Sequence, residues 1–420
     1  MRKELLVALL FLSLVSCDTD DSDPIIEEPE VISEGVFTVD LLEGYPYGID
    51  EVWLILHDLD GKPIDYAEVG TGGKAEFDVD RSGRYHLSLY YRNTLQGMDI
   101  NTIQTYTNIK ATRNITFGLS RTGRNIPEPT GNFEAIIKFN DYGNFGYTSS
   151  SFNTTNSGSY WLDYDLHMTT PIYPNEKKYL VAGVNNEGRI GYTYISNPEN
   201  DKTYSFDFES LKSYDRLVKI ENPAATSITY SVNAMTELNG FYHYGYAVSR
   251  NTSNRSSVEL GYLNEYKTYS TLVSASTPPG AKTQSFYYQL GEIPEKITLL
   301  TIPEINVLKN QITDFNFTLF PEATEYVVTF DYPNIWEYPD PIKNVRWFVY
   351  GNSPTFSLEL PEEIKNTYPL LSNLDKMQLE SIAINKNSYS YDEFIFDQFV
   401  EYPKLKTYTS QSVVQYYPKN

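Results

Sequence analysis

Asp163, Asp165 and His167 are the residues whose types and spacing come closest to a metal site. On a β-strand, residues two apart point to the same face, so the two carboxylates and the imidazole would lie side by side. Oxygen and nitrogen donors of this kind can hold a divalent ion. The same alternation places Tyr164 and Leu166 on the opposite, buried face, so a strand with one polar, solvent-facing side explains the three residues equally well. We expect no metal at this position.

Motifs for catalysis and for cofactor binding are missing from the sequence. It has no metalloprotease helix motif, no nucleophile elbow and no phosphate-binding loop. The histidines are too scattered to form a zinc cluster. They are His57, His86, His167 and His243. Glu362 and Glu363 are neighbours at a predicted helix start, where their side chains diverge, and do not make an acid and base pair. The sequence therefore predicts a protein that is not an enzyme and uses no cofactor.

Aromatic residues are the remaining candidates for ligand binding. Trp336 and Tyr338 lie in a proline-containing stretch that predicts a loop, and Tyr242 and Tyr244 flank His243. Flat rings with a polar edge suit stacking on sugar rings while their hydroxyls bond nearby oxygens. The competing interpretation is that tyrosine, present 37 times in the chain, is a common strand residue in cores and on sheet faces. We take these two pairs as the candidate ligand-binding residues.

Cys17 is the only cysteine of the 420 residues and ends an apolar segment at the amino terminus. Arg2 and Lys3 precede the apolar run of residues 5–15, which is shorter than the roughly 20 residues of a membrane-spanning helix. The run therefore indicates an export signal. A secretory leader with an accidental cysteine is the alternative interpretation. With no second cysteine, the exported part can form no internal disulfide.

Leu14, Val15, Ser16 and Cys17 resemble the lipobox of bacterial lipoproteins. The resemblance implies cleavage after Ser16, removal of the signal peptide 1–16, and acyl chains such as palmitate on Cys17. Each buried methylene contributes about 0.8 kcal/mol, so more than one acyl chain gives lasting attachment. We expect the membrane to be a partner of the chain through this lipid.

Residues 18–30 hold seven acids, two prolines and no base, which predicts an extended, solvated tether over residues 17–34. An acidic tract after the lipid-bearing cysteine resembles the surface-export signal of lipoproteins in Gram-negative bacteria. Asp18 directly after Cys17 resembles instead an inner-membrane retention signal. Several acids go beyond what one retention residue requires, so we expect an outer-membrane anchor and exposure at the cell surface.

Past residue 34 the dominant pattern is alternation of apolar and polar residues in short runs, which is typical of antiparallel strands. Residues 74–79 place Ala75, Phe77 and Val79 on one face and three charged residues on the other. Helical periodicity is scarce. We expect an all-β chain of tandem antiparallel β-sandwiches of the immunoglobulin or transthyretin-like kind.

The order of residues from Val52 to Tyr91 resembles a transthyretin-like or carboxypeptidase-regulatory-like β-sandwich. The matching residues are Asp60, Gly61, Lys62, Pro63, Ile64, Ala67, Val69, Phe77, Val79, Gly83, Tyr85, Leu87 and Leu89. The resemblance implies a structural or interaction module and transfers no active site.

Linker-like stretches divide the exported part into four expected modules. Gly123, Pro127, Pro129 and Gly131 mark the clearest linker. The expected modules are the transthyretin-like sandwich 35–122, two sandwiches at 130–222 and 223–320, and a β-rich domain at 322–420. In the last module we expect a short helix at 361–367 and strands at 379–384 and 393–399.

The formal net charge of −22 makes nucleic acid an unlikely partner, because binding to a phosphate backbone needs clustered Lys and Arg. The sequence thus predicts an exported, membrane-anchored lipoprotein that acts as a non-enzymatic binding, adhesion or scaffold protein with a surface protein as partner. The alternative is a glycan-binding accessory lipoprotein of a polysaccharide-uptake system.

Overall fold

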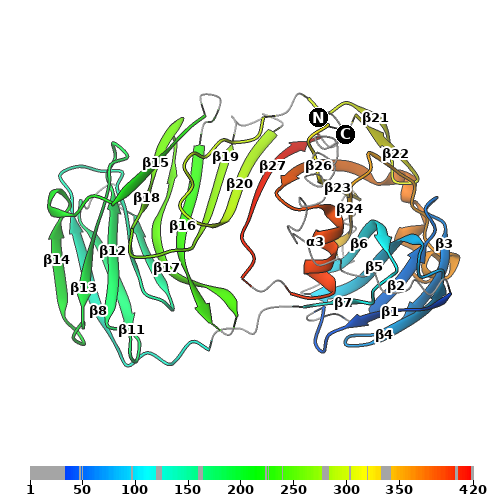
Figure 1. Cartoon of the computed structure of the whole chain (residues 1–420), viewed down its shortest axis with the longest axis horizontal. Helices are drawn as coiled ribbons and strands as arrows, with labels where there is room; N and C mark the ends of the chain where they lie inside the picture. Colours follow the sequence, from blue (N-terminus) through cyan, green and yellow to red (C-terminus); the bar gives the residue numbers. More distant parts are fainter. Residues whose placement is uncertain are drawn as a thin grey trace, which may run out of the picture.

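The computed structural model of this chain describes residues 34–46, 49, 51–95, 98–119, 125–158, 164–222, 225, 227–238, 240–276, 283–301, 304–318, 320–332, 342–402 and 405–417. Strands dominate these residues and pack in pairs of sheets, so the predicted all-β class is confirmed. The strands group into four sandwiches, numbered 1 to 4 along the chain (Figure 1).

Sandwiches 1 and 2 each contain seven strands. Sandwich 1 holds β1 (Gly35–Leu41), β2 (Glu51–His57), β3 (Pro63–Glu68), β4 (Lys74–Val79), β5 (Arg84–Leu95), β6 (Met98–Lys110) and β7 (Ile115–Phe117). Sandwich 2 holds β8 (Gly131–Lys138), β9 (Phe145–Ser149), β10 (Thr154–Gly158), β11 (Leu166–Ile172), β12 (Lys178–Val184), β13 (Ile190–Ser196) and β14 (Thr203–Asp207), followed by the 3-10 turn η1 (Phe208–Ser210).

Sandwiches 3 and 4 follow in the second half of the chain. Sandwich 3 holds β15 (Arg216–Glu221), β16 (Ser227–Leu238), β17 (Phe241–Ser253), β18 (Ser257–Tyr262), β19 (Tyr269–Ser276) and β20 (Thr283–Gly291). Sandwich 4 holds β21 (Val307–Gln311), β22 (Asp314–Phe317), β23 (Glu325–Asp331), β24 (Ile342–Gly351), β25 (Thr355–Phe356), α2 (Glu362–Thr367), η2 (Pro369–Ser372), η3 (Leu374–Lys376), β26 (Gln378–Asn387), α3 (Tyr391–Phe399) and β27 (Tyr408–Tyr416).

One strand order recurs in all four sandwiches. In sandwich 1, the sheet β4-β1-β7 faces the sheet β3-β2-β5-β6, and β1 runs antiparallel to β4 but parallel to β7. Sandwich 2 repeats this arrangement as β11-β8-β14 and β10-β9-β12-β13. The sheets β17-β16-β19-β20 and β24-β23-β26-β27 have the same order again, and each is paired with a smaller sheet. The larger sheet therefore has one strand order in all four sandwiches, whereas the smaller sheets of sandwiches 3 and 4, β15-β18 and β21-β22-β25, have only antiparallel pairs among the described strands.

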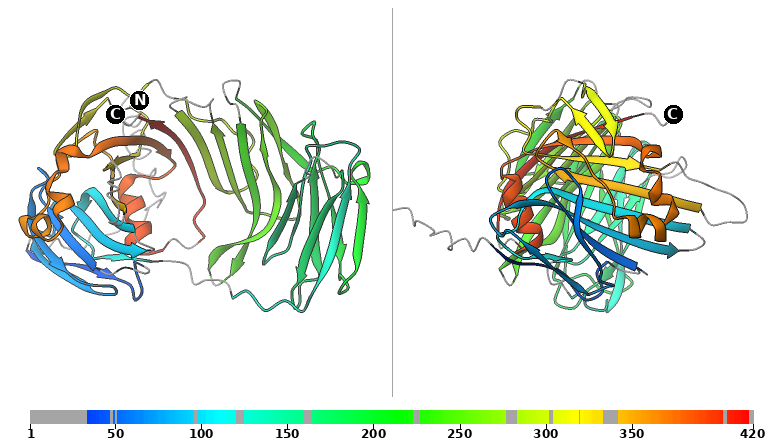
Figure 2. Two further views of the ribbon diagram at one scale, coloured as in Figure 1. Left: turned by 180° about the vertical axis from the view of Figure 1, so that it is seen from behind. Right: turned by 90° about the vertical axis from the view of Figure 1, so that its right-hand side faces the viewer.

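Edge strands join three of these sandwiches into one sheet of twelve strands. β20 of sandwich 3 pairs antiparallel with β27 of sandwich 4, and β24 of sandwich 4 pairs parallel with β6 of sandwich 1. Sandwiches 4 and 1 form one lobe and sandwiches 2 and 3 the other, as both faces of the molecule show (Figures 1 and 2). Neighbours in space are therefore not always neighbours in sequence.

The expected module boundaries need correction at two places, because they were placed by composition and not by strand pairing. β15 fell in the expected module 130–222, yet it pairs with β18 of sandwich 3. β22 fell in the expected module 223–320, yet it pairs with β25 of sandwich 4. The shared sheet also means that sandwiches 1, 3 and 4 are not separate in their strand pairing.

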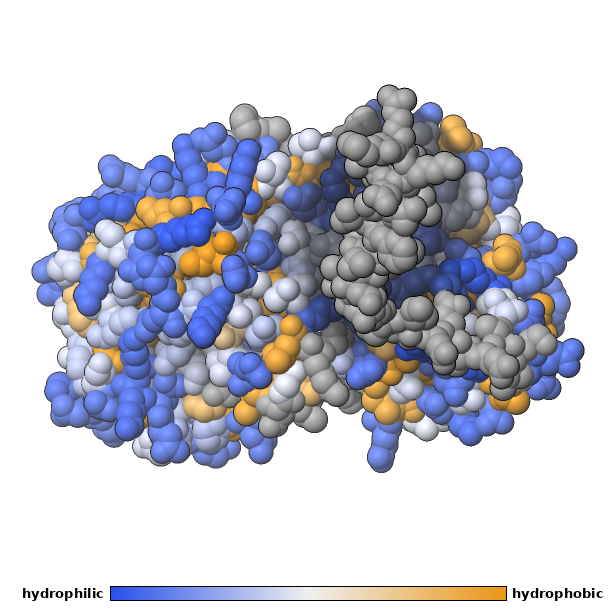
Figure 3. Space-filling model, in the orientation of Figure 1, coloured by the Kyte–Doolittle hydropathy of each residue, from blue (hydrophilic) through white to orange (hydrophobic). Residues whose placement is uncertain are grey.

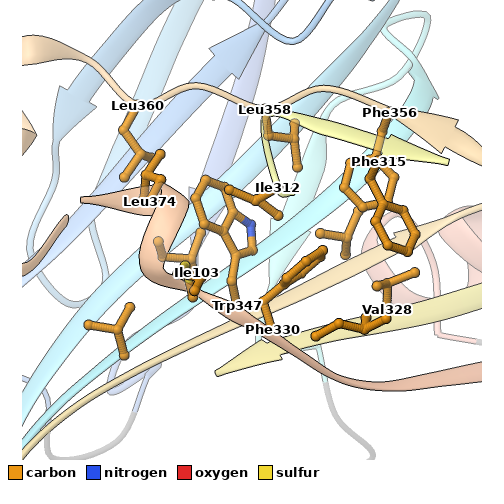
Figure 4. Packing of buried hydrophobic residues seen from close by; sticks show 14 of the residues in the cluster. Ile103, Ile312, Phe315, Val328, Phe330, Trp347, Phe356, Leu358, Leu360 and Leu374 are labelled. Atoms are coloured by element: carbon orange, nitrogen blue, oxygen red, sulfur yellow. The ribbon is translucent and has the colours of Figure 1, made fainter. Parts of the chain in front are cut away.

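Strands β2 and β12 are each buried on both faces, because each lies between two hydrophobic cores. In β2, Val52 and Leu54 face the core of sandwich 1, whereas Trp53 and Ile55 face the core of sandwich 4. Trp347 lies at the centre of the second of these cores (Figure 4). In sandwich 2, β12 likewise packs one face into its own core and the other face into the core of sandwich 3. Alternation in β4, by contrast, gives one buried and one exposed face, as predicted.

Helix α2 confirms the short helix expected at 361–367, but the strand expected at 393–399 is wrong. That segment is α3, which begins after Ser390. The Ser390 hydroxyl accepts a hydrogen bond from the Glu393 amide and the Glu393 carboxylate accepts one from the Ser390 amide, a capping box that stabilises the first turn. Tyr391, Ile395 and Phe399 share a face of the helix and pack into the core of sandwich 1. α3 lies in the hollow of the twelve-stranded sheet (Figure 1).

The visible face of the molecule is mostly hydrophilic, with small, separate hydrophobic areas (Figure 3). Exposed large apolar residues such as Ile64 and Leu308 come from different sandwiches. Among the described residues, no helix is long and apolar enough to cross a membrane.

Candidate functional site

The predicted ligand-binding residues fall in different places. Trp336 and Tyr338 lie outside the described residues, as do Leu14, Val15, Ser16 and Cys17. Tyr242 and Tyr244 both lie on β17, which follows a tight hairpin whose Gly240 has a φ of 78°. The positive φ favours glycine because a Cβ atom would crowd the residue's own backbone in this conformation.

Tyr242 lines a cleft between sandwiches 3 and 4, and Tyr244 does not. The cleft has a volume of about 80 Å³. Sandwich 3 contributes Tyr242 and Leu290, and sandwich 4 contributes the rest of the lining. These residues are Tyr389, Phe394, Asp397, Gln398, Tyr402, Lys406 and Tyr408. We call this set, with Tyr242 and Leu290, the aromatic cleft.

Helix α3 positions three of these side chains. Phe394, Asp397 and Gln398 are spaced three and four residues apart, so they share one face of the helix, while the face around Ile395 is buried. The Asp397 carboxylate forms an ion pair with the Lys406 ammonium. That ammonium also lies 5.4 Å from the centre of the Tyr389 ring.

The tyrosine rings of the cleft are held by one another. The Tyr408 ring contacts those of Tyr288, at 5.4 Å between centroids, and Tyr389, at 5.5 Å and nearly perpendicular. The Tyr402 ring contacts that of Phe241 at 5.8 Å. Burial raises the pKa of Tyr389 and of Tyr408, so both hydroxyls keep their protons at neutral pH. The cleft therefore presents neutral rings with hydroxyl groups that can donate and accept hydrogen bonds.

The metal hypothesis named Asp163, Asp165 and His167, but the structure shows a different carboxylate as the partner of His167. Asp163 lies outside the described residues, and the His167 ring nitrogen Nδ1 lies 2.9 Å from the Glu134 carboxylate on β8. In the described part of the chain, no three His, Cys, Asp or Glu side chains gather as a metal site would require.

Buried polar groups at the junction of sandwiches 4 and 1 form a row across neighbouring strands. His57 Nε2 lies 2.8 Å from the Ser88 hydroxyl, which lies 2.7 Å from the Thr105 hydroxyl. The Trp347 indole donates to the same Thr105 oxygen over 2.8 Å. Burial, followed by the nearby His86, lowers the pKa of His57 to about 3, so this ring is neutral and serves the fold.

A second polar cluster joins sandwiches 2 and 3. The Tyr246 hydroxyl donates to the Glu176 carboxylate over 2.5 Å, and the Tyr194 hydroxyl donates to Glu265. Lys178 completes the cluster with an ion pair to Glu265 at 2.7 Å. Tyr246 stands near Tyr242 in the sequence but belongs to this structural contact.

Two other cavities offer fewer rings. One, of about 830 Å³, opens between β21 and the start of β26 and has Tyr417 as its aromatic residue. The other, of about 350 Å³, lies between sandwiches 2 and 3 and holds Tyr230, Arg189, Lys219 and Arg255. The Arg255 guanidinium is already engaged by the carbonyls of Asn186 and Glu187. Of these three cavities, the aromatic cleft is the one whose lining combines several rings, hydroxyls and an ion pair.

Comparisons with known proteins identify no family for this chain. No protein-family model matches the chain, and no curated protein matches it. Among solved structures, the chain is similar to a candidate adhesin from Bacteroides ovatus ATCC 8483, at 11% identity over 50% of this chain and 99% of that one, with a TM-score of 0.14. A likeness at this level supports no conclusion about this chain.

Proposed function

We propose that this chain is an exported lipoprotein, anchored in the outer membrane through Cys17 and displayed at the cell surface, which acts by binding and not by catalysis. The observation that carries the proposal is the apolar segment ending in Leu14, Val15, Ser16 and Cys17 ahead of an acidic stretch and an all-β body.

The architecture supports a binding or adhesion role. Shared cores and continuous strand pairing connect the four sandwiches, so the molecule can carry load and hold a surface in a fixed position. At one end of the twelve-stranded sheet, β3 is an edge strand with Ile64 half exposed to solvent. Edge strands can pair with a strand of another protein, which favours protein-protein contact. Glycan capture is the second candidate, and the aromatic cleft favours it.

Metabolic labelling with palmitate tests the anchor. The wild-type protein should incorporate the label and stay with membranes, whereas the Cys17→Ala variant should lose both properties because no thiol remains to carry the lipid. Ser22→Ala, a nearby substitution within the acidic stretch, is the matched control and should behave as wild type. Label or unaltered membrane attachment in the Cys17→Ala variant would contradict the proposal.

Protease treatment of intact cells tests the display. Degradation of the wild-type protein under conditions that spare a periplasmic marker is the expected result. Full protection in intact cells, with degradation only after the outer membrane is broken, would place the binding protein on the periplasmic side.

A further inference from the structure

We propose that the aromatic cleft is a binding subsite for one neutral sugar residue at the end or on a branch of a glycan. This inference rests on the proposed binding function and names its ligand class. The subsite lies where sandwich 3 meets sandwich 4, between the start of β17 and the end of β20 on one side and α3 and β27 on the other.

The rings of the cleft are both accessible and preorganised. Tyr242, Tyr389, Phe394, Tyr402 and Tyr408 are all half-buried, so each keeps part of its ring in contact with solvent. Ring-ring contacts hold Tyr389 and Tyr408 in place before any ligand arrives. A core would bury such rings fully, as it buries Tyr262 and Tyr269 of sandwich 3. Rings already held in position stack on a ligand at a small cost in conformational entropy.

The polar groups of the cleft favour a neutral ligand with many hydroxyls. Asp397 and Lys406 neutralise each other, so the lining offers no net charge to select an anion or a cation. The carboxylate accepts hydrogen bonds and the ammonium donates them, while the exposed Gln398 amide does both. Sugar hydroxyls also donate and accept, and the axial hydrogens of a sugar ring present an apolar face to an aromatic ring. A purely apolar ligand would cover the Gln398 amide and the remaining hydrogen-bonding positions of the ion pair without satisfying them.

The size of the cleft limits how much of a glycan can enter. At about 80 Å³ the cleft is roughly half as large as the about 150 Å³ cavity that encloses a benzene molecule, so it cannot enclose a whole sugar ring. One sugar residue can place a face against the exposed rings while the rest of it stays in solvent, and the cleft is too small for a linear chain. A glycan must therefore enter by a terminal or branch residue and continue into solvent.

Saturation-transfer NMR on the full-length protein in detergent tests the subsite. The probes are glucose, galactose, mannose and N-acetylglucosamine, with glucuronate as the charged comparison. At least one neutral sugar should bind with a millimolar Kd, corresponding to about −4 kcal/mol, and more tightly than glucuronate. Tyr242→Ala should weaken that binding about tenfold, because one stacking ring is lost. Tyr242→Phe keeps the ring and should retain most of the affinity.

Tyr244→Ala is the matched control, since Tyr244 lies two residues away on the same strand, is 53% exposed and does not line the cleft. It should bind sugars as the wild type does. Gln398→Ala changes an exposed side chain, so it tests the cleft without disturbing the core, and should weaken binding several-fold.

Any of four results would overturn the subsite. Two concern the ligand: no neutral sugar binds at millimolar concentration, or glucuronate binds more tightly than every neutral sugar. Two concern the variants: both Tyr242→Ala and Gln398→Ala bind as the wild type does, or Tyr242→Ala and Tyr244→Ala lose binding equally. Failure here leaves the palmitate and protease results standing, so the sugar proposal and the surface-lipoprotein proposal are tested separately.

Discussion

The junction between sandwiches 4 and 1 and the junction between sandwiches 3 and 4 are both made by pairing of edge strands, yet their side chains differ. At the first, β24 pairs with β6, and Trp347 and His57 are fully buried. At the second, β20 pairs with β27, and the rings of the aromatic cleft beside the pairing are half-buried. Backbone pairing is therefore common to both junctions, and burial of the side chains distinguishes a structural junction from a candidate binding surface.

The largest effect on stability is expected from substitution of Trp347. Trp347→Ala should lower the free energy of unfolding by about 4 kcal/mol, because the indole is fully buried and donates to Thr105. Urea denaturation followed by circular dichroism measures this. A loss below about 1 kcal/mol would mean that the shared core of sandwiches 4 and 1 contributes little to stability.

The second largest effect is a dependence of stability on pH that arises from His57. The pKa of His57 in the folded state is about 3, below the ordinary value of 6.5. Between these two values the unfolded chain binds a proton that the folded chain does not, so stability falls as pH drops from 6.5 toward 3. At pH 5 the loss relative to pH 7 should be about 2 kcal/mol. His57→Gln should show a smaller loss over the same range. Equal pH profiles for the two proteins would rule out this assignment.

A smaller effect of opposite sign is expected at Glu325 on β23, which lies between the two junctions in the sheet. Burial raises the pKa of Glu325, although a hydrogen bond from the Asn385 amide opposes the shift. A raised folded-state pKa means that stability declines as pH rises from the unfolded value of about 4.5 through the folded one. Glu325→Gln should therefore be more stable than wild type by about 1 kcal/mol at neutral pH. Destabilisation of the variant at neutral pH would show that the ionised carboxylate is needed.

The smallest effect on stability is expected in the aromatic cleft. Tyr242→Ala should cost about 1 kcal/mol or less, because the ring is half-buried and lies outside the four hydrophobic cores. The measurement is the same urea titration. A loss as large as that of Trp347→Ala would assign Tyr242 to the fold and remove the contrast between the two junctions.

Alternation along the chain predicted the strands of sandwich 1 well, because β4 has one face in a core and one in water. The same pattern was less informative for β5, where His86 and Ser88 are buried together with Leu87 and Leu89. Ser88 is buried in the polar row that reaches Trp347 of sandwich 4, more than 200 residues away in sequence, and no local pattern encodes that contact.

The candidate site was predicted only in part. Tyr242 was named, but it was not separated from Tyr244, since the two residues share a face of β17 and differ only in which of them sandwich 4 reaches. The α3 residues of the cleft were missed because the apolar spacing of residues 393–399 suggested a strand. Ser390 followed three residues later by Glu393 is the helix-start signal that could have predicted them.

The parallel pairing of β6 with β24 has a consequence for how the chain is made. Val349 lies opposite Thr105 in the parallel register. Some 240 further residues must therefore be synthesised after Thr105 before β6 can pair with β24. Contacts of such high sequence separation form slowly and leave strand edges open to aggregation. A translation product truncated before β24 would expose that edge to other chains. The final quarter of the polypeptide thus protects its beginning from misassembly.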